Sequence, residues 1–226
     1  MASFSYNGTA AEDDLIGDVQ YWADEVLATG QTIGPDPENM YEALVAAMRT
    51  TLNGAPRAAT DHIADDGSGQ MITNTNEHSE VALPDTFLEL LELRLASWGK
   101  EVYRLHDPRS ERVRQQYDPH TRTDVANPVV TKVPSPDGTG EQLRCWPQGA
   151  GPSIDRFLFV PQVAPEEGPQ DLKHPMVFWA GAYVLTAEKE QGAQALQQAA
   201  RLMLRQIDAG MMPLPQQALS EADDDS

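Results

Sequence analysis

The sequence predicts an α+β protein in which N- and C-terminal helix pairs pack as a helical bundle, with a central antiparallel β-rich insertion between them. Apolar residues recur at helical spacing near both ends of the chain, in residues 13–54 and 168–210. Short alternating runs separated by turn sequences fill residues 55–167 instead. Because helices and strands are segregated along the chain rather than alternating, the pattern favours the α+β class.

The N-terminal region is expected to form an αα-hairpin. A flexible polar arm and two helices are predicted, at residues 1–12, 13–30 and 36–53 respectively. In the first helix Val19 and Trp22 belong to one apolar stripe. The second has the clearer start, because Asp36 is a good N-cap residue and Pro37 suits the first helical position.

The middle of the chain carries strand and turn signals. Residues 129–133 and 142–146 flank the sequence Pro-Asp-Gly-Thr-Gly, which predicts a β-hairpin. Phe157–Val160 reads as a short strand, and the prolines that follow it indicate an edge strand or a strand end.

Two stretches of this middle region are less regular. Residues 81–98 fit either a helix face or an alternating strand, and we favour a β-hairpin with the run that begins at Val102. Residues 55–80 are rich in turn-forming residues, so a loop or a short ribbon fits them better than a helix.

The C-terminal third returns to helical spacing. Helices are expected at residues 172–187 and 190–209, with Trp179 and Met203 in a core shared with Val19 and Leu44 of the first pair. Residues 211–226 read as an acidic, solvated tail.

Composition excludes several classes of function. The 226 residues include 16 Lys and Arg against 35 Asp and Glu, a formal net charge of −19. Such a charge argues against an autonomous nucleic-acid binder and against docking on anionic lipid. The single cysteine, Cys145, rules out an intramolecular disulfide. Apolar runs are far shorter than the roughly 20 residues of a membrane span, and no Lys or Arg precedes Arg49, so neither a span nor a secretory signal is expected.

No pattern typical of catalysis emerges. The five histidines are scattered without metal-ligand spacing. The acidic turn before Gly67 lacks the alternating ligands of a calcium loop, and Ser68 lacks the spacing of a nucleophile elbow. Cys145 has no neighbouring base in sequence, so a half-buried strand residue is the better interpretation. The sequence therefore predicts a protein that is not an enzyme, with no catalytic, cofactor-binding or metal-ligating residues.

The distribution of charge is more informative. Residues 1–48 contain nine acidic residues and no Lys or Arg, whereas residues 94–122 contain seven basic residues against four acidic ones. Both segments can simply be solvated surfaces. The functional hypothesis is that the basic segment of one copy contacts the acidic helices of the next, which would close a ring. The residues assigned to this contact are Arg109, Arg112, Arg114, Asp13, Asp14 and Asp18.

The patterns at Glu80–Phe87, at Asn127–Pro147 and at His174–Ile207 together resemble head-to-tail connector proteins of tailed bacteriophages, the adaptor, ring and tail-tubular-like components below the portal. Glu80–Phe87 is similar to an "LP-x-x-F/L" entry into the family's sheet. Asn127–Val130, a Gly-containing turn and Gln142–Pro147 are similar to its "Pv…g…L.lyP" hairpin. His174–Ile207 looks like its closing helices, and with the order of elements the resemblance covers most of residues 13–209. The first helices are more acidic, and the loop at residues 55–80 longer, than in the family pattern.

The resemblance implies a non-enzymatic virion protein, assembled in the host cytoplasm, that forms a homo-oligomeric and typically dodecameric ring. Its implied partners are the portal protein and other neck or tail proteins. DNA would pass through the ring without specific binding, and no membrane or cofactor is implied. A small acidic cytosolic enzyme or binding module, with a site assembled from distant residues, is the alternative. A minor capsid or scaffold protein is a further one, although it would be more helical.

Overall fold

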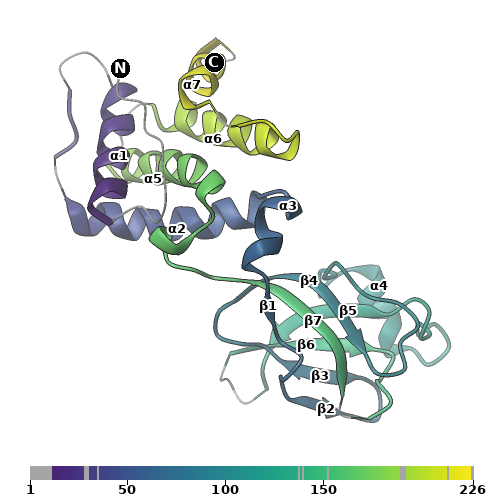
Figure 1. Cartoon of the computed structure of the whole chain (residues 1–226). Coiled ribbons are helices and arrows are strands. Elements are labelled where there is room, and N and C mark those ends of the chain that lie inside the picture. Colours follow the sequence, from purple (N-terminus) through teal and green to yellow (C-terminus); the bar gives the residue numbers. More distant parts are fainter. Residues whose placement is uncertain are drawn as a thin grey trace. The chain divides into compact units, whose positions relative to one another are not determined.

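The computed structural model describes residues 12–27, 31–34, 36–136, 138, 140–151, 153–188, 192–212 and 214–224. It divides into two compact units, one formed by Met1–His62 with Val163–Ser226 and the other by Ile63–Gln162 (Figure 1). Helices and two antiparallel sheets occur in the same chain, so the α+β prediction is confirmed. The flexible arm predicted for residues 1–12 lies outside the described residues apart from its last one.

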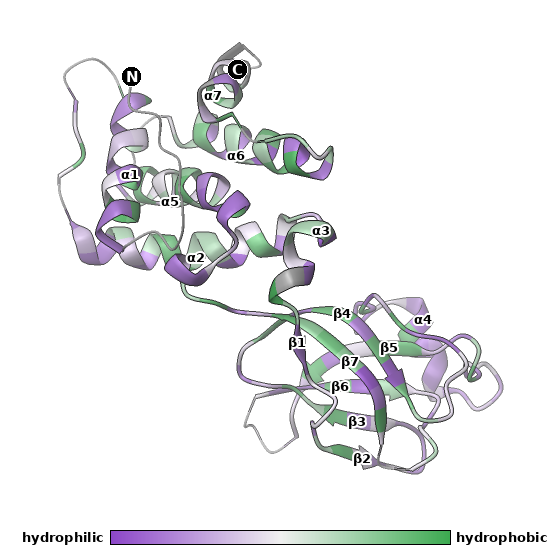
Figure 2. Ribbon diagram, viewed as in Figure 1, coloured by the Kyte–Doolittle hydropathy of each residue, from purple (hydrophilic) through white to green (hydrophobic). Residues whose placement is uncertain are grey.

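The first unit is helical. Its α-helices are α1 (Glu12–Glu25), α2 (Pro37–Gly54), α3 (Arg57–Thr60), α5 (Lys173–Ala187), α6 (Ala193–Asp208) and α7 (Pro215–Asp224). Two 3₁₀ turns, η3 (Pro165–Glu167) and η4 (Gln170–Leu172), precede α5. Helix α5 contacts α1, α2 and α6 (Figure 1), and α7 packs against α6. Figure 2 shows α5 as hydrophobic along most of its length, which is typical of a helix buried on all sides.

The predicted apolar stripes form the interior of this unit. Val19, Leu44 and Met203 are fully buried, and Trp179 is nearly so. The Trp22 and Phe178 rings lie 4.7 Å apart between centroids, which joins α1 to α5. As the sequence predicts, α2 begins after Asp36, whose side chain accepts a hydrogen bond from the backbone N–H of Asn39 at 3.2 Å.

The second unit is built from two antiparallel sheets. Its strands are β1 (Asp65–Asp66), β2 (Ile72–Asn74), β3 (Ser79–Ala82), β4 (Phe87–Leu95), β5 (Val129–Pro134), β6 (Glu141–Trp146) and β7 (Ile154–Pro161). One sheet has the order β1-β7-β4 and the other β2-β3-β6-β5. Side chains from both sheets share one core, with Phe157 and Phe159 from the first and Val81, Leu143 and Cys145 from the second.

The strand predictions hold in part. The hairpin over 129–133 and 142–146 is confirmed, with Val129 opposite Trp146. Residues 87–95 are a strand, but the partner run beginning at Val102 is reduced to a single bridge with Leu93. An edge position for the strand around Phe157–Val160 is wrong, because β7 lies between β1 and β4. Its end at Pro161 agrees with the other interpretation.

Two helical segments differ from the sequence prediction. Helix α3 and the 3₁₀ turn η1 (Asp61–Ile63) occupy part of the region expected to be loop or ribbon. Helix α7 (Pro215–Asp224) occupies most of the predicted solvated tail. Ala218 and Ala222 are buried and four residues apart, so one face of α7 can pack on α6. The acidic composition of the C-terminal stretch therefore led to the wrong prediction of a solvated tail, where a short amphipathic helix forms.

Candidate subunit interface

The basic segment of the β unit is held by a short capped helix, α4 (Glu111–Arg114), followed by η2 (Gln115–Tyr117). The hydroxyl of Ser110 accepts a hydrogen bond from the Val113 N–H at 3.4 Å, in the usual N-cap arrangement. Val113 itself is buried and packs with Val129 and Trp146. This apolar anchor fixes one face of the segment, while Arg112 and Arg114 on either side of Val113 remain exposed.

Gln116 links α4 to the residues that follow η2. Its side chain is 2% exposed; Nε2 donates to the Arg112 carbonyl at 2.8 Å, and Oε1 accepts from the Thr123 N–H at 2.9 Å. Nε of Arg122 donates to the Gln116 carbonyl at 2.9 Å. A buried amide that satisfies backbone groups on both sides holds the loop in one conformation.

Two arginines near this segment are paired with carboxylates of the β unit. Nη2 of Arg122 lies 2.9 Å from Oε1 of Glu77, and Nη2 of Arg144 lies 3.3 Å from Oε1 of Glu80. Glu80 also contacts Nε2 of His78 at 3.1 Å. Burial opposes ionisation of Glu80, but the hydrogen bonds and positive charge of His78 and Arg144 hold the pKa of its carboxyl below the ordinary value. These arginines and carboxylates therefore pair with one another within the β unit.

Arg109, Arg112 and Arg114, hereafter the arginine patch, are different. All three are exposed, and no carboxylate among the described residues lies within ion-pair distance of them. Arg114 is held locally, because Nε and Nη2 donate to the Arg109 carbonyl at 3.2 and 3.0 Å. The patch thus presents uncompensated positive charge on an ordered backbone.

The pKa of His106 reflects this local positive charge. Burial lowers the pKa of its imidazole, and the charges of Arg112 and Arg104 lower it further. Tyr117 adds an aromatic group on the same segment. It is 51% exposed, its ring packs edge-on against Trp146, and its hydroxyl accepts a hydrogen bond from Arg144 at 3.0 Å. Exposed tyrosine beside arginine is the composition enriched at protein interfaces.

The acidic residues of the predicted contact divide into two groups. Asp13 and Asp14 are exposed in the first turn of α1, together with Glu12, and these three are hereafter the acidic turn. Asp18 is not part of the exposed surface that the sequence predicts, because it is only 6% exposed. It lies three residues after Leu15 and four before Trp22, which places it on the buried face of the helix.

The remaining features to consider are the single cysteine, clusters of possible metal ligands and long apolar helices. Cys145 is fully buried in the core between the sheets, where burial raises the pKa of its thiol. Over the part of the chain that the structure describes, no cluster of three or more His, Cys, Asp or Glu side chains is arranged to hold a metal ion. None of the helices in that part has the length and apolar character that crossing a membrane requires.

Comparison with known proteins adds no family assignment. No protein-family model matches the chain, and no curated protein matches it.

Sequence reasoning located the arginine patch but missed the residues that position it. Glu77 pairs with Arg122 and Glu80 with Arg144 across 45 and 64 residues, so these ion pairs depend on the tertiary fold. Gln116 bonds locally, to the Arg112 carbonyl four residues before it. The sequence Ser-Glu-Arg-Val-Arg at Ser110–Arg114 did contain a cap followed by a helical turn, which was a usable signal.

Proposed function

We propose that this chain is a structural, non-enzymatic virion protein, a ring-forming head-to-tail connector of a tailed bacteriophage. It sits below the portal, joins the capsid to the tail and lines the DNA channel. The ring contains identical subunits, twelve by analogy with the family that the sequence resembles. The portal protein and the neighbouring tail or neck proteins are its partners.

The observation that carries the proposal is a local positive patch on the β unit together with a strongly acidic helical unit. The helical unit contains 20 acidic and 6 basic residues, whereas the arginine patch lies on the β unit. A second copy of the chain offers the acidic turn as a partner for this unpaired patch. Because the two surfaces differ, the contact is heterologous, and repetition of such a contact closes a ring when the rotation permits.

Charge alone does not supply the affinity in this proposal. An exposed ion pair contributes about 0–1 kcal/mol. Its role is to select the partner surface and its register, while aromatic groups such as Tyr117 contribute contact area. The same contact recurs at every interface of the ring, so a small pairwise preference is repeated.

In the proposed ring, the helical unit lines the DNA channel. Helices α1, α2, α5 and α6 form the bundle of the subunit, and the β unit is an insertion between α2 and α5. The acidic surface of the bundle faces the channel, where negative charge repels the DNA backbone. DNA can then pass without adhering, and the basic residues serve contacts between proteins.

The test is the mass of the purified chain in solution, combined with electron microscopy of the same sample. The proposal predicts closed rings of uniform mass, or rings that form when the portal protein is added. A chain that stays monomeric at micromolar concentration, with and without its portal, would overturn it.

A further inference from the structure

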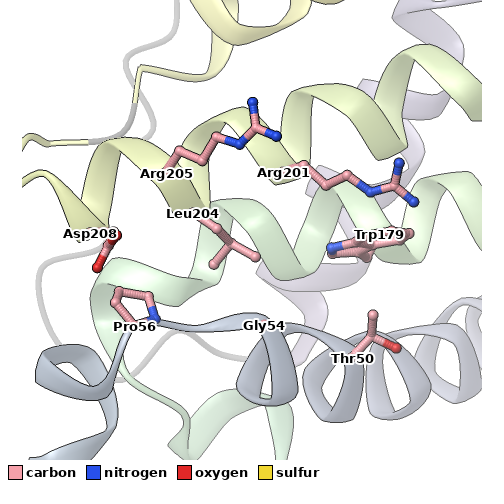
Figure 3. Close-up of a pocket in the computed structure, with 8 residues that line it drawn as sticks. All are labelled: Thr50, Gly54, Pro56, Trp179, Arg201, Leu204, Arg205 and Asp208. Atoms are coloured by element: carbon pink, nitrogen blue, oxygen red, sulfur yellow. The ribbon is translucent and has the colours of Figure 1, made fainter.

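A pocket of about 480 Å³ lies within the helical unit, between α2 and α6, with α5 contributing its floor (Figure 3). Its size falls in the range of small-molecule sites, which is roughly 300–1,000 Å³. The pocket is separate from the arginine patch, which belongs to the β unit. Its lining residues are Thr50, Gly54, Pro56, Trp179, Arg201, Leu204, Arg205 and Asp208.

Trp179 gives the floor of the pocket an unused hydrogen-bond donor. The residue is only 8% exposed. Its indole Nε1 has no acceptor among the described residues. In Figure 3 the nitrogen lies on the edge of the ring that faces Leu204. A buried N–H without an acceptor costs free energy, so an acceptor entering the pocket would recover that cost.

The rim of the pocket is positive. The guanidinium of Arg201 lies over the Trp179 ring, 5.5 Å from its centroid, and Figure 3 shows Arg205 further along the same helix. No carboxylate among the described residues is within ion-pair distance of either arginine. The unit holds only six basic residues against 20 acidic ones, so placing two of them here concentrates positive charge at one site.

The remaining lining limits the kind of anion. Gly54, Pro56 and Leu204 are apolar and favour a ligand with an apolar body. Asp208 adds a negative charge to the rim, which opposes a dianion more strongly than a monoanion. Thr50 supplies no free donor, because its hydroxyl is engaged with the Tyr183 hydroxyl at 2.6 Å and with the Ala46 carbonyl.

We infer that this pocket binds a small organic monocarboxylate with an apolar body. The carboxylate pairs with Arg201 and Arg205, whose planar guanidinium groups match its geometry. Trp179 Nε1 donates a hydrogen bond to the ligand, and the apolar body rests against Leu204 and Pro56. The arginine patch and ring assembly play no part in this binding, so the inference stands apart from the proposed function.

The test uses the full-length chain and cyclohexanecarboxylate as the probe, with calorimetric titration to measure affinity. The fluorine NMR spectrum of 5-fluorotryptophan-labelled protein reports on the pocket, and Trp179→Phe assigns the Trp179 signal. Saturable binding that shifts this signal is expected. Arg201→Gln and Arg205→Gln should each weaken binding by about tenfold, as expected for loss of a charged hydrogen bond. Trp179→Phe, which keeps the aromatic stack but removes the N–H, should weaken binding less.

Arg49→Gln is the matched control, because it removes one exposed positive charge from α2 without touching the pocket lining. It should leave the affinity unchanged. The inference is overturned if the Trp179 signal does not move at a probe concentration of about 10 mM, well above a weak dissociation constant of about 1 mM. Equal weakening by Arg49→Gln and Arg205→Gln would also overturn it, as would inorganic phosphate binding more tightly than the carboxylate.

Discussion

Nη2 of Arg122 lies 2.9 Å from Oε1 of Glu77, although 45 residues separate them in sequence. Arg122 also donates from Nε to the Gln116 carbonyl. The same guanidinium therefore links the segment that carries the arginine patch to the turn between β2 and β3. The patch is positioned by an arginine outside it, which allows its order and its charge to be tested separately.

Replacing Arg122 by Met should loosen this segment without unfolding the β unit. The ion pair is partly exposed, so the loss in unfolding free energy should stay below about 1 kcal/mol. Hydrogen exchange at the Thr123 amide, which donates to Gln116, should become faster. Lys132→Met is the matched control, because it removes the ion pair with Glu141 within the β5–β6 hairpin. If both variants accelerate exchange at Thr123 equally, Arg122 has no special positioning role.

Gly67 should not tolerate a side chain. A Cβ at this position would lie 2.4 Å from Cδ1 of Phe157, a fully buried core ring. The Gly67 N–H also donates to the Phe157 carbonyl at 2.8 Å, so the backbone cannot easily move away. Gly67→Ala should therefore destabilise the β unit by about 1–3 kcal/mol. Hydrogen exchange of the β7 amides measures this unit directly.

Gly69→Ala provides the comparison for that experiment. A Cβ at Gly69 meets nothing within 4 Å. Its effect on the β7 amides should stay within about 0.5 kcal/mol. Protection factors that fall equally in the two variants would show that the Phe157 contact is not the cause.

Lys173 should make the stability of the helical unit depend on pH. It is 1% exposed, and its Nζ donates to the Pro165 carbonyl. Burial lowers the pKa of this amine from 10.5 to about 8, while the nearby charge of Glu166 opposes the shift. Between these two pKa values the unfolded chain binds a proton that the folded chain does not. The unfolding free energy therefore rises with pH across this window, by up to about 3 kcal/mol.

Lys173→Met removes this titration while keeping an unbranched side chain of similar length. The stability of the original chain minus that of the variant should therefore increase from pH 8 to pH 10.5. The difference is best followed by denaturant unfolding of both proteins at matched pH. Parallel stability curves for the two proteins over this window would contradict the assignment to Lys173.

The sequence predicted the elements whose signals are local. The cap at Asp36 and the turn between β5 and β6 each depend on a few neighbouring residues. The strand at Phe87–Leu95 was ambiguous because apolar residues fill both of its faces in part, which blurs the period of two. Its position beside β7 is set by pairing with residues about 60 to 75 positions later in the chain.

The candidate interface and the pocket also contain parts that the sequence could predict and parts that it could not. Clustering of arginine in sequence was enough to identify the patch, and helical spacing could have shown that Asp18 points inward with Leu15 and Trp22. The pocket under Arg201 gave no sequence signal, because its lining combines residues 50–56 with residues of α5 and α6 more than 100 positions later. Its unused donor, Trp179 Nε1, is evident only when the neighbours of the indole are known.

The central claim is that the arginine patch of one subunit contacts the acidic turn of the next. A charge swap in two steps tests it, with circular dichroism confirming that each variant is folded. The first variant reverses the patch, and the second adds the reversal of two acidic positions. The substitutions are Arg109→Glu, Arg112→Glu and Arg114→Glu, followed by Asp13→Lys and Asp14→Lys.

The decisive measurement is the mass of each variant in solution at low and high salt, compared with the unaltered chain. The first variant should fail to form the ring because like charges then oppose each other across the contact. The second should restore the ring, and salt should weaken the effect of both changes. Rings of unchanged mass in the first variant, insensitive to salt, would contradict the account and leave apolar packing as the cause of assembly.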